Sequence, residues 1–169
     1  AGLNGGVQTM FGFDNVTDMR IALEYGVTKN LMLGFGRCKG TGVPYRSLLD
    51  GFVKYRFLEQ VKESMPVSLA LIGGASFTYQ KASSDISKVN HVPNVIHRFA
   101  YYTQLNLARR FGKLLSVSIM PTLVHRNYVA DMDLNTLLTL GGAMRFRLSK
   151  KFFFLTEYYH CFNGSEYRQ

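Results

Sequence analysis

Four histidines are the residues of this sequence best suited to metal or acid–base chemistry. His97, His125 and His160 are expected near the ends of strands that share one rim, and His91 lies in the adjacent loop. Imidazoles gathered at a rim could bind a transition metal. The four histidines lack HxH and HxxxH spacing, however, and rim histidines are more often solvated or part of an aromatic belt. We therefore predict no metal site and no cofactor.

A lipid hydrolase or acyl transferase would need a nucleophile and an acid beside a histidine base. His125 and His160 could act as bases, with Ser47 or Ser165 at the same rim, but no nucleophile stands in a recognisable local motif. We predict no catalytic residue and a protein that is not an enzyme. The glycines of "LGFGRCKGTG" superficially resemble a phosphate loop, yet neither Lys-Ser/Thr nor an expected helix follows them.

The composition indicates one folded unit spanning residues 1–169. The 169 residues are 47% hydrophobic and 18% charged, which opposes disorder. No run of eighteen apolar residues predicts a transmembrane helix, but spanning strands of about ten alternating residues escape such a search. The net charge of +9 suggests anionic partners. The basic residues are dispersed, without an arginine-rich run or an RNP-like motif, so we predict no nucleic-acid binding.

Alternating segments separated by turns predict an antiparallel, up-and-down all-β fold. In three segments two strands are joined through a short turn that contains lysine, namely "ALEYGVTKNLMLGFGR", "LARRFGKLLSVSIMP" and "RFRLSKKFFF". The alternate connections are mostly longer and polar, an asymmetry typical of outer-membrane barrels. Eight strands are expected, over residues 19–25, 30–37, 48–58, 67–80, 95–110, 114–126, 134–147 and 152–162.

Each predicted strand has one apolar face and one polar face. In the fourth strand Leu69, Leu71 and Phe77 alternate with Ser68, Ser76 and Thr78. Periodicity alone leaves two interpretations open. A soluble, lipocalin-like barrel would bind an apolar ligand on the apolar face, whereas a membrane barrel would turn that face outwards to lipid.

Three features favour the membrane interpretation. Aromatic residues gather at strand ends, as in interfacial girdles. Small residues such as Gly34, Gly36 and Gly74 would leave space for long side chains in a narrow interior. Opposite charges also recur on the polar face, Arg20 with Glu24, Asp50 with Lys54 and Glu157 near Arg145, as a closed lumen would require. The predicted lumen charge network is Arg20, Glu24, Asp50, Lys54, Arg145 and Glu157.

Basic residues near the longer loops suggest a lipid contact. Lys and Arg at strand ends would bind the phosphates of anionic outer-leaflet lipids. The candidates are Arg37, Lys39, Arg46, Lys81, Arg98 and Arg126.

Four pieces carry a family resemblance, namely "MFGFDNVTDMRIALEYGVTKNLMLGFGR", "DGFVKYRFL", "PVSLALIGGASF" and "MPTLVHRN". Together they resemble an uncharacterised Bacteroidetes outer-membrane β-barrel family, whose members are known mainly as a domain of unknown function. The resemblance covers about residues 11–163 and implies an outer-membrane barrel in a Gram-negative envelope, with no known substrate or catalytic residue. The chain lacks the terminal aromatic strand that such barrels generally present. We therefore expect a transmembrane β-barrel of about eight to ten strands, truncated at both termini relative to the full protein.

The expected function is that of a non-enzymatic outer-membrane barrel, acting as an envelope scaffold, a subunit of a membrane complex or a narrow conduit. Its partners would be the lipid bilayer, anionic outer-leaflet lipids, and other outer-membrane or periplasmic proteins. A soluble or periplasmic ligand-binding barrel and a membrane-embedded lipid-modifying enzyme stay open as alternatives.

Overall fold

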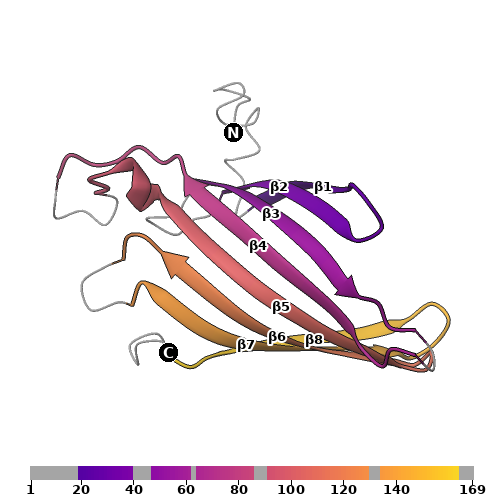
Figure 1. Cartoon of the computed structure of the whole chain (residues 1–169). Helices are drawn as coiled ribbons and strands as arrows, with labels where there is room; N and C mark the ends of the chain where they lie inside the picture. The colour runs from indigo at the N-terminus through magenta and orange to yellow at the C-terminus, as the bar shows by residue number, and fades with distance from the viewer. Residues whose placement is uncertain (1–18, 40–46, 62–63, 86–90, 130–133, 164–169) are drawn as a thin grey trace.

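Eight antiparallel strands form one curved sheet in the order in which they occur along the chain (Figure 1). The computed structural model describes residues 19–39, 47–61, 64–85, 91–129 and 134–163. The strands are β1 Met19–Gly26, β2 Leu31–Lys39, β3 Ser47–Leu58, β4 Ser68–Thr78, β5 Phe99–Phe111, β6 Leu115–Arg126, β7 Thr136–Arg147 and β8 Phe153–Cys161. The predicted all-β, up-and-down fold is confirmed.

The strand boundaries lie close to the predicted ones, with one clear exception. The predicted fifth strand began at residue 95, but Val95–Arg98 form a short 3-10 helix and β5 begins at Phe99. Asn94 is extended before this helix, and His97 N–H donates to the Asn94 carbonyl at 3.1 Å. The local hydrogen bond closes a turn, so these residues leave the ladder.

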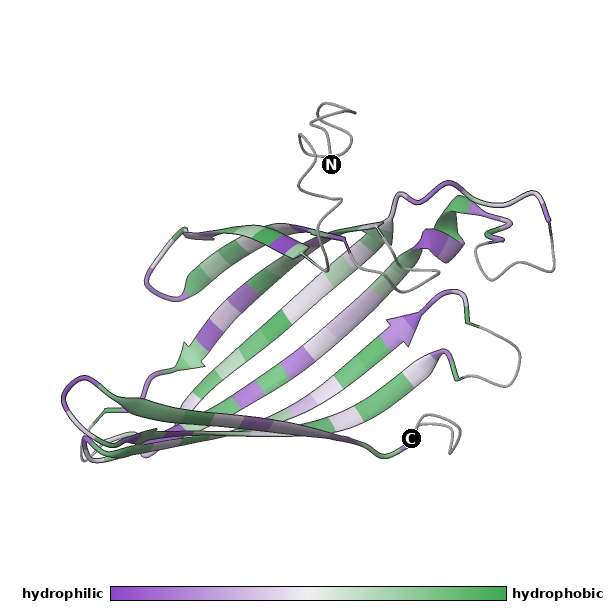
Figure 2. Cartoon of the chain, turned by 180° about the vertical axis from the view of Figure 1, so that it is seen from behind, coloured by the Kyte–Doolittle hydropathy of each residue, from purple (hydrophilic) through white to green (hydrophobic). Residues whose placement is uncertain are grey.

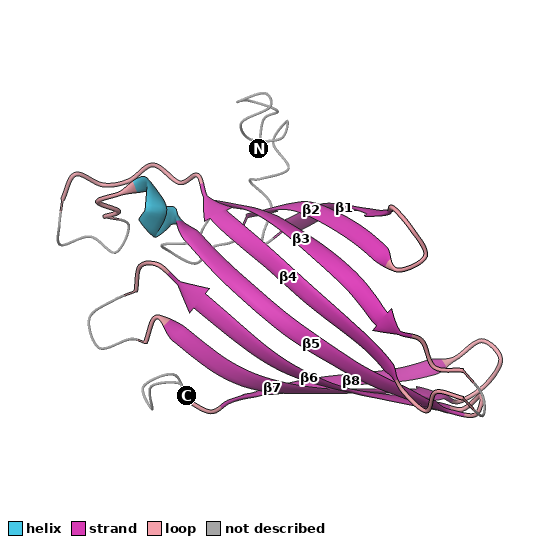
Figure 3. Cartoon of the chain, in the orientation of Figure 1, coloured by secondary structure: helices cyan, strands magenta, loops and turns pink. Residues whose placement is uncertain are grey.

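At one end of the sheet the β1–β2, β5–β6 and β7–β8 connections are tight turns, and the β3–β4 connection, residues 59–67, is longer. The other end carries the β2–β3, β4–β5 and β6–β7 connections (Figure 3). In the β1–β2 turn the Thr28 hydroxyl accepts from the N–H groups of Asn30 and Leu31, at 3.2 and 3.0 Å. Ser149 does the same in the β7–β8 turn. The β5–β6 turn instead uses Gly112, whose φ of 60° is readily adopted only by glycine. We call the end of the sheet that carries these turns the turn end, and the opposite end the loop end.

Side-chain contacts identify the polar face as the inner, concave one. Gln104 Nε2 on β5 reaches the hydroxyl of Tyr159 on β8, at 3.3 Å, across β6 and β7. Arg20 on β1 likewise bonds Asp50 on β3 across β2. Side chains two or three strands apart converge in this way on the concave side of a sheet. Figure 2 shows the hydrophilic and hydrophobic residues alternating along the strands that carry these contacts.

The apolar face is the outer one, and it is exposed. Leu23 is 76% exposed, Phe35 58% and Ile119 52%, while within the described residues only Gly36, Ala70, Thr78, Met120 and Gly141 are buried. A soluble barrel would cover such side chains in its interior. The alternative of a soluble barrel that binds an apolar ligand on an inward apolar face is therefore wrong. That face contains Leu69, Leu71, Val117 and Ile119, which alternate with the inner residues in the ladder.

Aromatic side chains lie at both ends of the outer face. At the loop end the rings of Phe77 and Phe99 are 4.9 Å apart, and Tyr101 follows. At the turn end Tyr55 packs against Phe57 at 4.9 Å. The strands β1 and β8 are not paired with each other in the described part of the chain, so the sheet is open along these two edges (Figure 1).

Within the described residues, no helix has the length and apolar character needed to cross a membrane.

Candidate functional site: the inner face of the sheet

Three inner aromatic rings lie flat over glycines of the preceding strand. Phe52, Tyr102 and Tyr159 stand directly opposite Gly34, Gly74 and Gly141 in the ladder. A Cβ atom on any of these glycines would collide with the ring. Glycine thus lets a large side chain lie along the wall instead of projecting across the interior.

An ion pair uses a fourth glycine. Arg20 Nη2 lies 2.6 Å from Asp50 Oδ2, and the pair passes over Gly36, which stands between them on β2. A Cβ on Gly36 would lie 2.8 Å from Asp50 Oδ1 and 3.1 Å from Arg20 Nη2. The absence of a side chain at Gly36 therefore makes room for a bond that spans two strand spacings.

The predicted lumen charge network contains this pair, but its partners were predicted wrongly. Arg20 was matched with Glu24, and Asp50 with Lys54, four residues along the same strand in each case. Such residues are about 13 Å apart at 3.3 Å per residue, whereas adjacent strands lie about 4.8 Å apart. The cross-strand partner is the nearer one. Glu24 and Lys54 occupy inner positions opposite Gly34 and Ile72.

At the other side of the sheet Arg145 does not pair with Glu157. Its Cζ lies 4.1 Å from the centre of the Phe153 ring, and Glu157 stands opposite Ala143, further from the turn. Ring and guanidinium attract each other because the face of the ring is electron-rich.

A polar cluster occupies the middle of the C-terminal half. Gln104 Nε2 donates to Thr122 Oγ1 at 2.9 Å and to the Tyr159 hydroxyl, and that hydroxyl lies 3.6 Å from Met120 Sδ. These bonds link β5, β6 and β8 on the inner face.

Sequence reasoning named Arg145 as a lumen residue but missed the other basic residues that gather with it on the inner face at the turn end. Arg110, Ser116 and Arg145 stand in one row across β5, β6 and β7. Together with Arg147 and the turn residue Lys113 they border a hollow of about 230 Å³. Alternation places Arg110 and Arg145 on polar faces, but only the register between strands brings them together.

The lipid-phosphate candidates have varied surroundings. On the outer face Arg37 donates from Nε to the Tyr79 hydroxyl at 2.8 Å and lies over that ring. Arg98 donates to the carbonyls of Thr78 and Gln80, and Arg126 to the carbonyl of Leu134. Lys39 ends β2 and Lys81 follows β4, while Arg46 lies outside the described residues.

The histidines are held by separate neighbours. His125 Nδ1 lies 2.8 Å from Thr136 Oγ1, His97 stacks on Tyr128, and His160 packs edge-on against Phe162. His91 Nδ1 contacts the Ser83 carbonyl. No group of three His, Cys, Asp or Glu side chains that could hold a metal occurs among the residues described. Ser47 begins β3, and Ser165 lies outside the described residues.

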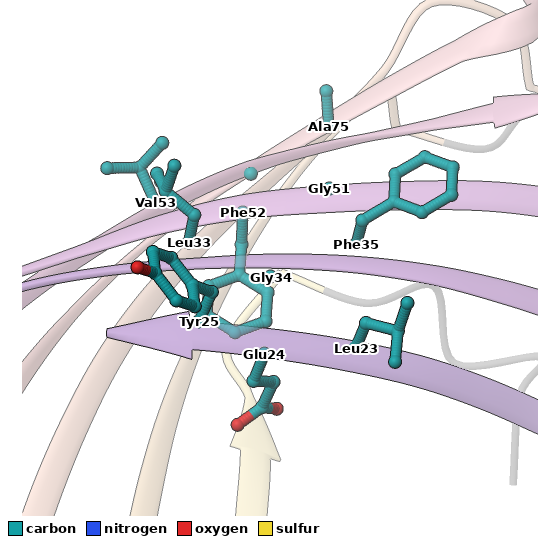
Figure 4. Close-up of a pocket in the computed structure, with 12 residues that line it drawn as sticks. Leu23, Glu24, Tyr25, Leu33, Gly34, Phe35, Gly51, Phe52, Val53 and Ala75 are labelled. Carbon is teal, nitrogen blue, oxygen red and sulfur yellow. The ribbon is translucent and has the colours of Figure 1, made fainter. Parts of the chain in front are cut away.

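The outer face has an apolar hollow of about 970 Å³ over β1–β4. In Figure 4 Leu33, Phe35 and Val53 border it on one side of the strands, and Phe52 and Glu24 lie on the other side. The floor contains Gly73, where a Cβ would meet no atom within 4 Å. The hollow exists because two outward positions, Gly51 and Gly73, lack side chains.

Comparison with known proteins agrees with this architecture. No curated protein and no solved structure matches the sequence. A family model, described as a membrane-bound beta barrel domain, matches residues 1–169. A membrane explains an exposed apolar outer face, and a barrel explains a polar concave inner face. The chain therefore belongs to the family of membrane-bound beta barrel domains known as DUF5777.

Proposed function

We propose that this chain forms the wall of a non-enzymatic barrel in the outer membrane of a Gram-negative bacterium. We also propose that this barrel is a narrow conduit for small polar solutes. A Bacteroidetes source is part of the proposal and rests on the resemblance of the sequence pieces alone. The conduit is proposed because the inner aromatic rings lie flat against the wall, over glycines of the neighbouring strands.

Inner side chains decide whether a barrel is filled or open. Phe52, Tyr102 and Tyr159 lie over glycines of the neighbouring strands, and the Arg20–Asp50 pair passes over Gly36. A scaffold that needs only a stable wall gains most by projecting such side chains across the interior, where they pack against each other. Rings that lie flat against the wall fill less of the interior than rings that project across it, which supports a conduit.

The outer face has the dimensions of a bilayer. Tyr101 and Phe111, both exposed on β5, are ten residues apart. At about 3.4 Å per residue and a tilt of about 45°, this separation is about 24 Å along the membrane normal, close to the apolar band of roughly 25 Å in such barrels. Acyl chains would cover the band and occupy the hollow over Gly51 and Gly73.

The loop-end cations support a contact with anionic lipid. Arg37 lies on the outer face beside Tyr79, where a guanidinium could bind a headgroup phosphate while the ring stays at the interface. Lys39 and Lys81 lie at the same end of the sheet. We include outer-leaflet anionic lipids among the partners on this basis.

The conduit is tested by reconstituting the full-length natural protein into planar lipid bilayers. We expect small, stepwise conductances that increase with salt concentration. Protein that is folded, as judged by heat-modifiable gel migration, but carries no current would overturn the conduit. That outcome would favour an envelope scaffold or a subunit of a membrane complex, and copurification from native membranes would then identify the partner. Lipid turnover abolished by His125→Ala or His160→Ala would instead overturn the non-enzymatic assignment.

A further inference from the structure

The inner face at the turn end carries a concentration of positive charge that the proposed function does not use. Arg110, Ser116 and Arg145 occupy one row across β5, β6 and β7. Since adjacent strands lie about 4.8 Å apart, the two arginines start about 10 Å apart with the Ser116 hydroxyl between them. Arg147, two residues beyond Arg145, and Lys113 complete the border of the hollow of about 230 Å³.

No carboxylate borders this hollow among the residues described. Glu59, the acidic residue at the adjoining hollow, lies 3.1 Å from Arg56. Four cations therefore face one small space. Like charges around one small space repel each other, and the repulsion falls when an anion binds between them. The hollow has room for several waters, at about 30 Å³ each, and hence for a small oxyanion.

Two of the four cationic groups, those of Arg145 and Arg147, are held in place by other contacts. The Phe153 ring lies 4.1 Å from Arg145 Cζ and 5.8 Å from Arg147 Cζ, and Arg147 Nε donates to the Ser149 carbonyl at 3.1 Å. These contacts orient the guanidinium groups without neutralising them.

The backbone of Arg110 is fixed from the other side. Its N–H donates to Gln60 Oε1 at 2.7 Å, and its carbonyl accepts from Gln60 Nε2 at 2.9 Å. The β4–β5 ladder ends at Ala108, so the Gln60 amide continues it and keeps Arg110 in register. A site whose donors are oriented in advance loses less freedom when an anion binds.

We propose that Arg110, Lys113, Ser116, Arg145 and Arg147 bind a phosphate group, either as inorganic phosphate or as part of a small phosphate monoester. Arginine forks donate in pairs to phosphate oxygens, and the serine hydroxyl and the lysine ammonium supply further donors. A dianion matches four cations better than a single carboxylate or chloride does. The inference deepens the proposed conduit by naming its solute class, and it therefore rests on the interior being open to solutes.

Binding is measured on the full-length protein in detergent by isothermal titration calorimetry. Because this measurement does not depend on transport, a failure of the phosphate site can be distinguished from a failure of the conduit. Inorganic phosphate, glycerol phosphate and chloride are titrated separately. We expect phosphate or glycerol phosphate to bind at least about tenfold more tightly than chloride. Arg110→Gln and Arg145→Gln should each weaken that binding by about tenfold or more, because each removes a charge-assisted donor pair.

Arg109→Gln is the matched control. Arg109 precedes Arg110 but faces outwards, with its Cζ 4.9 Å from the centre of the Phe111 ring. The control removes the same charge on the other face and should leave binding unchanged. Arg145→Lys keeps the charge but loses the fork, and should bind with intermediate affinity. All variants are first checked for heat-modifiable migration.

Three results would overturn the site. Chloride could bind as tightly as both phosphates, Arg109→Gln could weaken binding as much as Arg145→Gln, or folded Arg145→Gln could bind phosphate as the natural protein does. Tighter binding of glycerol phosphate than of inorganic phosphate supports the site and identifies the monoester as its source, whereas the reverse order identifies free phosphate.

Discussion

Two charged regions of the inner face are built in opposite ways. Arg20 and Asp50 neutralise each other over Gly36 at 2.6 Å. Arg110, Lys113, Arg145 and Arg147 face one hollow without an acidic residue at its border in the described part of the chain. The first region resolves its charges within the protein. The second leaves its charges available to bind an anion. The charges of the first region therefore contribute to stability, and those of the second to binding.

The largest effect is expected where a glycine accommodates a ring. Gly34→Val should destabilise the barrel by about 1–3 kcal/mol or more, because the new side chain takes the space of the Phe52 ring. Urea unfolding in lipid vesicles measures the change. Gly73→Val is the control, since its outward position has no atom within 4 Å of a Cβ. Equal destabilisation by the two variants would show that replacing any strand glycine, and not the collision with the Phe52 ring, lowers the stability.

The neutralised region should be sensitive to losing one partner. Asp50→Asn leaves Arg20 without its carboxylate and should lower the free energy of unfolding by about 1 kcal/mol, the upper end of the range for partly exposed pairs. Arg20→Gln should lower the free energy of unfolding less in the Asp50→Asn background than in the natural protein. Strict additivity in this double-mutant cycle would mean that the ion pair contributes nothing.

The basic region should respond differently. Arg145→Gln relieves repulsion but loses the contact with the Phe153 ring, so without phosphate its free energy of unfolding should stay within about 0.5 kcal/mol of that of the natural protein. Added phosphate should raise the urea midpoint of the natural protein and not that of the variant, because a ligand stabilises only the state that binds it. A phosphate-induced rise of equal size in both proteins would count against the site.

The smallest phosphate-dependent effect, namely none, is expected for Arg109→Gln. Its guanidinium packs on Phe111 at the outer edge of the apolar band, where exposed cation–π contacts contribute about 0.5–1 kcal/mol at most. Unfolding in the presence and absence of phosphate should give the same small difference. A phosphate-dependent difference would mean that Arg109 and Arg110 do not lie on separate faces.

The strand pattern was predictable because the alternation of side chains has a fixed period of two. The eight strands and the short turns with Thr28 and Ser149 follow from local chemistry, and most strand ends lie within two residues of their predicted positions. Val95–Arg98 was not predictable as a 3-10 helix, since its apolar residues also fit a strand. Which lumen charges pair was equally beyond local reasoning, because the distance between Arg20 and Asp50 depends on the register of β2 between them.

The amino-acid sequence by itself determined the elements and their two faces, since both depend on neighbours a few residues apart. Only the tertiary structure decided which face is concave, which glycines receive Phe52, Tyr102 and Tyr159, and that Arg110 and Arg145 flank Ser116. Those relations join residues separated by many positions along the chain. They are fixed by sheet curvature and strand register, which no single strand contains.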